Sequence, residues 1–257
     1  MKQIFLTSML FLFLFQSCKK DDSPANSKIF KGTPIRMGNG SAWSWIEIGP
    51  DGPKTLGITF EEAAFTNLPS GKDQTTEYEF EPTLPSQKTL TPFNHIVVDW
   101  NPLGHPPTNI YDKPHFDLHF YLMDEADRLQ IPSYGEDSSG FLQYPAAAYL
   151  PATYFPFPGG EAQMGTHWAD GTSPELNPVN PQPFTQTFIY GSYKGNVTFY
   201  EPMVTLNFMT TTTSFTRDIP QPSKWGKDGY YPTKVSFKKR DGTMQVTLHD
   251  FVYRSKS

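Results

Sequence analysis

In residues 114–123, with the sequence PHFDLHFYLM, polar and apolar side chains alternate from His115 to Leu122. Successive side chains of a β-strand point to opposite faces, so this stretch predicts a strand with one apolar and one polar face. The apolar face carries Phe116, Leu118, Phe120 and Leu122. The polar face carries His115, Asp117, His119 and Tyr121. Polar groups next to a core are costly without partners, so the partners of this polar face are the central question.

The rest of the chain shows short alternating segments separated by turns. The 257 residues include 25 prolines and 19 glycines, which indicates many turns and few long helices. Further strands are predicted at 43–48, 55–60, 78–80, 95–100, 187–190, 196–207, 233–240 and 243–253. An Asp241-Gly242 turn between the last two is typical of a hairpin. One short helix is predicted at 124–130, and residues 132–186 have a mostly irregular pattern. We therefore expect a mainly β protein, with a single antiparallel β-barrel or β-sandwich domain over 33–257, long loops and one short helix.

The N-terminus has the pattern of a bacterial lipoprotein signal. Lys2 precedes an apolar stretch at 4–15, which is too short for a standard transmembrane helix, and Gln16-Ser17-Cys18 follows. Cys18 is the only cysteine, so no disulfide can form within the chain and the thiol is free for lipidation. This predicts a signal peptide at 1–17, a lipid-anchored flexible tether at 18–32, and an outer-membrane lipoprotein on the periplasmic or cell-surface face. The alternative is an ordinary secretory peptide with an incidental cysteine.

Charge and motifs exclude several classes of function. The formal net charge is −5 and the charges are dispersed, which argues against nucleic-acid binding. The sequence has no phosphate loop, no Gly-x-Gly-x-x-Gly fingerprint and no Gly-x-Ser-x-Gly nucleophile motif. Lipidation of Cys18 would also leave no cysteine for nucleophilic catalysis. The membrane is then the one expected partner, through the lipid anchor.

Histidines and one glutamate suggest a metal site. His115 and His119 share the polar face of residues 114–123, His167 lies between Gly165 and Trp168, and Glu201 lies on an otherwise apolar strand face. Imidazole and carboxylate groups are ligands for zinc and other transition metals. We predict a divalent metal ion bound by His115, His119, His167 and Glu201, with His105, Asp117, Tyr121 and Trp168 as neighbours that support the ligands.

Strand geometry restricts this prediction. In a regular strand the Cα atoms of His115 and His119 are about 13 Å apart, and each is about 6.6 Å from that of Asp117. Both imidazoles can reach one ion only if the strand has a bulge at 116–118 or a strong twist. Otherwise only part of the set shares a site.

Two other interpretations stay open from the sequence. The histidines can be structural, each satisfied by hydrogen bonds, and Glu201 can pair with a cation. The domain can also be a non-catalytic binding or assembly module for a small molecule, a glycan or a protein. A metal with an open coordination position would favour water activation, and thus a hydrolase. The sequence does not decide between an enzyme and a binding protein.

Several blocks together resemble an uncharacterised family of bacterial extracytoplasmic proteins, known chiefly as a domain of unknown function. They are PHFDLHFY at 114–121, MGTHWAD at 164–170 with Ser173-Pro174-Glu175, FIYG at 188–191, FYEPM at 199–203, and NPLGHPP at 101–107. The resemblance covers about residues 95–210. It implies a β-rich fold and a secreted setting, and it brings no assigned reaction.

Overall fold

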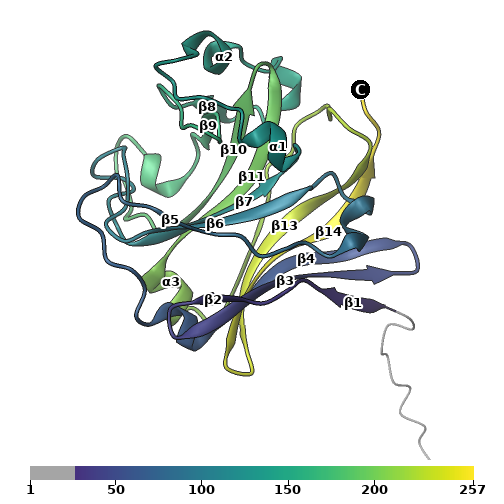
Figure 1. The fold of residues 1–257 in the computed structure, drawn as a ribbon. Helices are drawn as coiled ribbons and strands as arrows, with labels where there is room; N and C mark the ends of the chain where they lie inside the picture. Colours follow the sequence, from purple (N-terminus) through teal and green to yellow (C-terminus); the bar gives the residue numbers. More distant parts are fainter. Residues whose placement is uncertain (1–26) are drawn as a thin grey trace, which may run out of the picture.

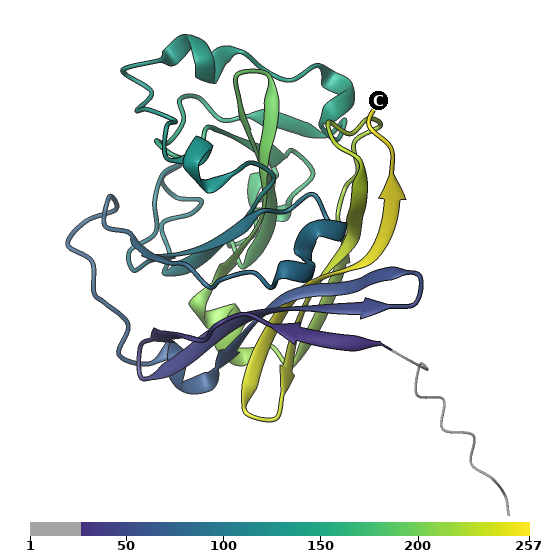
Figure 2. The same cartoon turned by 45° about the vertical axis from the view of Figure 1, so that its right-hand side comes forward.

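The computed structural model describes residues 27–257. The predicted signal peptide, Cys18 and the first part of the predicted tether lie outside these residues. Within them, two antiparallel sheets of seven strands pack face to face as a β-sandwich, and neither closes into a barrel (Figures 1 and 2). The prediction of a mainly β fold is confirmed, in its sandwich form.

The first sheet contains both ends of the described chain. Its strand order is β1-β3-β4-β14-β13-β12, and β2 pairs with β3. The strands are β1 (Lys28–Lys31), β2 (Ile35–Met37), β3 (Gly40–Gly49), β4 (Gly52–Glu61), β12 (Ser214–Asp218), β13 (Gly229–Arg240) and β14 (Thr243–Arg254). Because β1 pairs with β3, the sheet begins at Lys28, inside the segment predicted to be a tether.

The second sheet carries the polar strand. Its order is β5-β6-β7-β11-β10-β9-β8. The strands are β5 (Tyr78–Phe80), β6 (His95–Asn101), β7 (His115–Tyr121), β8 (Tyr154–Pro156), β9 (Thr166–Asp170), β10 (Gln186–Tyr193) and β11 (Asn196–Thr205). Strand β7 lies between β6 and β11, so its backbone hydrogen bonds are satisfied on both edges. The strand predicted over 114–123 is therefore central to this sheet.

The helices are short. They are α1 (Glu125–Arg128), α2 (Ser138–Leu142) and α3 (Leu206–Thr211), with 3-10 turns η1 (Glu62–Phe65), η2 (Ser86–Leu90), η3 (Ala147–Tyr149) and η4 (Pro174–Leu176). The helix predicted at 124–130 is α1, and two others accompany it. Strand β11 ends at Thr205, earlier than the predicted end at residue 207, because Thr205 accepts a hydrogen bond from the amide of Phe208 and caps α3. No helix in residues 27–257 has the length and apolar character needed to cross a membrane.

The alternation in β7 divides its side chains between a core and a site. Phe116, Leu118 and Phe120 are fully buried in the core between the sheets. They pack there with residues of the first sheet such as Ile46 and Leu56. The polar side chains of β7 consequently lie on the outer face of the second sheet.

This outer face is covered by the long segment between α1 and β10 and by the loop before β7. Met164 and Ala169 pack with Tyr121, Ile189 and Phe199 in one apolar cluster. Tyr111 and Phe184 pack with Met203 in another. The segment predicted as irregular thus also supplies two strands, β8 and β9, to the sheet edge. The polar row of β7 is buried beneath this cover.

Candidate metal centre

A cavity of about 360 Å³ opens over the outer face of the second sheet. Four acidic residues are among those that line it: Glu77, Asp117, Glu161 and Glu201. Its imidazoles are His105 and His167, and its apolar wall includes Ile189, Met203 and Phe157. Carboxylates and imidazoles that converge at the wall of an apolar cavity are typical of a small-molecule or metal site.

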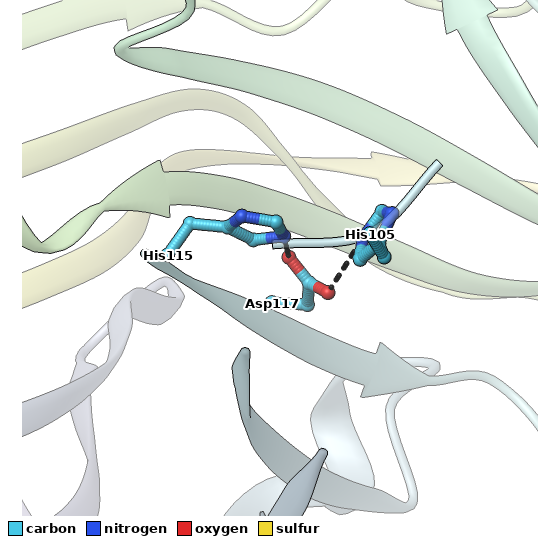
Figure 3. A group of neighbouring side chains, drawn as sticks. All are labelled: His105, His115 and Asp117. Atoms are coloured by element: carbon cyan, nitrogen blue, oxygen red, sulfur yellow. Dashed lines mark hydrogen bonds and ion pairs between the residues drawn. The ribbon is translucent and has the colours of Figure 1, made fainter. Parts of the chain in front are cut away.

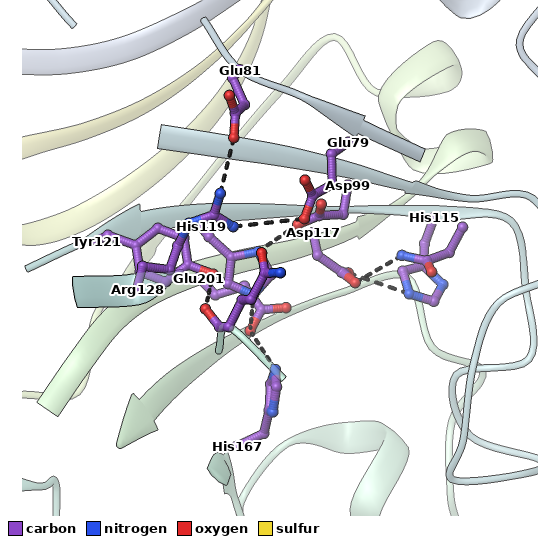
Figure 4. Close-up of polar contacts among 12 residues, drawn as sticks. Glu79, Glu81, Asp99, His115, Asp117, His119, Tyr121, Arg128, His167 and Glu201 are labelled. Atoms are coloured by element: carbon purple, nitrogen blue, oxygen red, sulfur yellow. Dashed lines mark hydrogen bonds and ion pairs between the residues drawn. The ribbon is translucent and has the colours of Figure 1, made fainter. Parts of the chain in front are cut away.

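His119, His167 and Glu201 form the first group, called site 1 here (Figure 4). One ligand atom from each residue lies within 4.8 Å of the others. The Nε2 atom of His119 is 3.6 Å from Oε2 of Glu201, and Nε2 of His167 is 3.9 Å from the same oxygen. The side chains of His119 and Glu201 are each 1% exposed, whereas that of His167 is 22% exposed towards the cavity. Buried His and Glu groups that could hold a metal ion are thus brought together here.

Strand register places site 1. Strands β7 and β11 pair through Phe120↔Tyr200 and Asp117↔Met203 in one unbroken register, which puts Glu201 opposite His119. His167 comes from β9, which is separated from β11 by β10. It pairs there with Gly191 of β10. All three side chains therefore project from the same face of the sheet.

Two glycines allow this approach. Gly191 lies between His167 and Phe199 in the sheet, and a Cβ there would be 2.1 Å from the Phe199 ring. That ring packs against both His119 and His167, with ring centroids 4.6 and 5.2 Å away. Gly165 has a φ of +108°, and a Cβ there would be 2.3 Å from the carbonyl oxygen of Ser192. The close backbone approach just before His167 thus requires glycine at this position.

His105, His115 and Asp117 form a second group, called site 2 here (Figure 3). The Nε2 atom of His105 is 3.2 Å from Oδ2 of Asp117, and Nε2 of His115 is 3.3 Å from Oδ1. The two imidazole rings are perpendicular, with centroids 4.6 Å apart. Asn101 donates a hydrogen bond of 2.8 Å to Oδ2 of Asp117 and fixes the carboxylate. Site 2 is therefore next to site 1 along strand β7, and it lies beside the same cavity.

Burial sets the protonation of site 1. Burial lowers the pKa of His119 to about 4. Burial, followed by the charges of His119 and His105, lowers the pKa of His167 to about 3. Burial, followed by the charges of Asp117 and Asp99, raises the pKa of Glu201 well above its usual value. Both imidazoles are therefore neutral near pH 7, with a lone pair available on each ring.

The protonation of site 2 differs from that of site 1. Burial by itself would raise the pKa of Asp117, but His115 and His105 lower it below its usual range. Burial opposes protonation of His105, yet its hydrogen bond and attraction to Asp117 raise its pKa to about 9. Asp117 is thus a carboxylate, with imidazoles on both of its oxygens.

Asp99 and Asn101 are residues of the site that the sequence reasoning missed. The Oδ2 atom of Asp99 is 2.7 Å from Nδ1 of His119, and both side chains are buried. Asp99 pairs with Asp117, and Asn101 pairs with His115, across β6 and β7. The available signal was the buried-strand pattern of residues 95–101, in which a carboxylate and an amide alternate with apolar residues.

The structure divides the predicted ligand set. His119, His167 and Glu201 meet, but His115 does not join them, because the unbroken register of β7 leaves no bulge to bring it closer. His105 and Asp117, predicted as supporting neighbours, instead surround His115. Tyr121 stacks on His119 with centroids 5.5 Å apart. Trp168 points away, into the core between the sheets, where it donates to Ser192, so it does not shield His167 from solvent.

Comparison of the chain with protein-family models, curated proteins and solved structures found no match. The resemblance of its sequence blocks to a domain of unknown function stays a prediction.

Proposed function

We propose that this protein binds a divalent transition metal ion, with zinc as the first candidate, at site 1. The ligands are Nε2 of His119, Nε2 of His167 and Oε2 of Glu201. The observation that carries the proposal is that Nε2 of His119 and Oε2 of Glu201 are buried without a hydrogen-bond partner and yet converge on one point. Buried polar atoms are rarely left unpaired, and a cation between them satisfies both.

The distances support coordination more than hydrogen bonding. At 3.6 and 3.9 Å, the two nitrogen–oxygen pairs are too far apart for hydrogen bonds. Ligand atoms of a tetrahedral zinc ion, with bonds of about 2.0–2.1 Å, are about 3.3 Å from each other. To reach this distance from 3.6 and 3.9 Å, Nε2 of His119 and Nε2 of His167 need to approach Oε2 of Glu201 by about 0.3 and 0.6 Å.

The ligand set also supports a reaction class. Two histidines and one glutamate are a known ligand set of catalytic zinc, in which the fourth position is left for water or substrate. His167 and Glu201 both line the cavity, so that position would face it. A bound ion supplies a nucleophilic water at neutral pH, which makes hydrolysis the best-supported chemistry. The cavity volume of about 360 Å³ favours a small-molecule substrate or a single group of a larger one.

Metal titration by calorimetry and elemental analysis tests the proposal. Purified protein stripped with a chelator should bind zinc at site 1, and His167→Ala should abolish that binding. His167 is partly exposed, so this variant should keep its fold. His249→Ala, at a histidine on the opposite sheet that contacts Ser236 and Asp250, is the matched control and should bind as the parent does. Zinc binding unchanged in His167→Ala would overturn the proposal.

Hydrolysis has its own test. Zinc-loaded protein should cleave at least one member of a panel of chromogenic esters, amides and phosphoesters, and His167→Ala should not. A loaded protein without activity on any of them, but with a specific ligand in the cavity, would favour the binding-module alternative.

We also propose that Cys18 is lipidated and anchors the domain to the outer membrane. Support comes from the apolar stretch and lone cysteine of the N-terminus. Cys18→Ser in the full chain should move the protein from the membrane fraction to the soluble fraction. Unchanged membrane association would contradict the anchor.

A further inference from the structure

We propose that site 2, formed by His105, His115 and Asp117, is a second divalent-metal site, separate from site 1. It stands on observations of its own and does not depend on the proposed function. The first is that Nε2 of His115 and Oδ1 of Asp117 are buried, 3.3 Å apart, and have no hydrogen-bond partner. The side chain of His115 is 0% exposed, so water does not satisfy these atoms from bulk solvent.

The second observation is how the two imidazoles are held. His105 donates its Nδ1–H to the carbonyl of Pro106 at 2.7 Å, and His115 donates its Nδ1–H to the carbonyl of Lys113 at 2.6 Å. A carbonyl only accepts, so Nδ1 carries the proton on both rings. In its neutral form each ring then directs the lone pair of Nε2 towards Asp117. Backbone carbonyls that fix histidines in this way are common around bound metals.

A purely structural reading of site 2 leaves a conflict. For both rings to donate to Asp117 through Nε2, both must be imidazolium ions, with centroids 4.6 Å apart inside the protein. If one stays neutral, its lone pair faces a carboxylate oxygen. A cation removes the conflict, because it accepts both lone pairs and one carboxylate oxygen together. The separation of 3.3 Å between Nε2 of His115 and Oδ1 of Asp117 matches the distance of about 3.3 Å between ligands on a tetrahedral zinc ion. One ligand atom from each of the three residues lies within 4.8 Å of the others, so Nε2 of His105 is close enough to join them.

Asp117 is well suited to be the shared ligand. Its Oδ2 accepts from Asn101, which orients the carboxylate and leaves Oδ1 free for the ion. His105 comes from a loop and is 31% exposed, so an ion can enter from the cavity that His105 and Asp117 line. Two histidines and one carboxylate are suitable for zinc and related transition metals.

The two ions would be separate centres in one cavity. Their ligands Asp117 and His119 are two residues apart on the same strand face, which places the centres roughly 7 Å apart. Two-metal hydrolytic pairs share a bridging ligand at about 3.5–4 Å, so we infer two mononuclear sites.

Zinc stoichiometry in site variants tests this inference. We expect two zinc ions per chain in the parent protein, one in His105→Ala, one in His167→Ala and none in the double variant, measured by elemental analysis after equilibrium dialysis. His105 is a loop residue, so its variant should keep the fold, and circular dichroism checks this. His249→Ala should retain two ions.

Failure of site 2 is distinguishable from failure of site 1. One ion in the parent that His167→Ala removes and His105→Ala retains would overturn the second site and leave the proposed function standing. One ion that only His105→Ala removes would support site 2 and reject site 1. A protein that binds no zinc would overturn both.

Discussion

Oδ2 of Asp99 lies 2.7 Å from Nδ1 of His119, and the carboxylate and the imidazole are 0% and 1% exposed (Figure 4). Burial and the charge of Asp117 raise the pKa of Asp99. In its ionised form Asp99 accepts the Nδ1 proton of His119, which leaves the lone pair of Nε2 directed at Glu201. This arrangement sets both the tautomer and the orientation of a ligand, as in many carboxylate–histidine–zinc sites. Asp99 would therefore position His119 for the metal ion proposed at site 1.

We expect Asp99→Asn to weaken zinc binding at site 1 by about ten- to a hundred-fold, because the amide holds the required tautomer less well. Competition with a chromogenic chelator measures this affinity. Asp250→Asn is the matched control, since Asp250 pairs with the surface residue His249 at 3.1 Å. Equal zinc affinities in Asp99→Asn and Asp250→Asn would show that Asp99 does not orient His119 for metal binding.

Glu201→Gln should separate stability from metal binding. Oε2 of Glu201 is buried without a partner, so without metal the neutral amide should raise the free energy of unfolding by about 1–3 kcal/mol. The same substitution should abolish the thermal stabilisation that zinc gives through site 1, because binding to the native state alone is what raises the melting temperature. Urea unfolding and thermal melts provide the two readouts.

Glu175→Gln supplies the comparison for Glu201→Gln. Glu175 is also a buried carboxyl group with an unpaired oxygen, and it belongs to neither site. Its substitution should leave the zinc-induced shift unchanged. A Glu201→Gln protein that zinc stabilises as much as the parent would argue against Glu201 as a ligand.

Arg128 should be a large contributor to stability beside the site. Its guanidinium is 1% exposed, pairs with Glu81 at 2.9 Å and with Glu79 at 3.6 Å, and lies over the ring of Tyr121 at 5.3 Å. We expect Arg128→Ala to lower the free energy of unfolding by about 2–4 kcal/mol, through lost packing and lost charge pairing. Lys234→Ala breaks the exposed pair with Asp250 and should have little effect in the same urea experiment. Similar midpoints for the two variants would contradict this role.

His95 should make stability depend on pH. It stacks on Tyr121 with centroids 4.6 Å apart, and burial, followed by the charges of Arg128 and Lys88, lowers its pKa to about 4, which Asp124 offsets only in part. The unfolded chain, with a pKa near the ordinary value of about 6.5, therefore takes up a proton first as the pH falls. This contribution to stability is complete above about pH 6.5 and is lost progressively towards pH 4.

His95→Phe keeps an aromatic stack but cannot titrate. We expect its free energy of unfolding to fall less than that of the parent between pH 7 and pH 4.5, as measured by urea unfolding at each pH. Parallel pH profiles for the two proteins would show that His95 does not take part.

The fold was predictable where periodicity is strong. The alternation of residues 114–123 identified β7 and its two faces, because the period of two is a direct consequence of strand geometry. Strands β8 and β9 were missed, since these short strands lie in a segment rich in proline and glycine and have little pattern of their own. They are stabilised by pairing, β9 with β10 and β8 with β9.

The site was predictable in its residue types more than in its grouping. The spacing of His115 and His119 already showed that a regular strand separates them, and the structure keeps them apart in two groups. Asp99 and Asn101 escaped notice because their roles come from cross-strand pairing with β7, which one sequence does not display. Trp168 was misplaced for a related reason, since its strand neighbour His167 takes the outer face and alternation sends Trp168 to the core.

If His119, His167 and Glu201 bind one metal ion, anomalous diffraction at the zinc absorption edge will locate it. Crystals of the protein grown with zinc should show an anomalous peak at bonding distance, about 2.0–2.2 Å, from the three ligand atoms of site 1. A well-ordered crystal at saturating zinc with no peak among those three side chains would contradict the account.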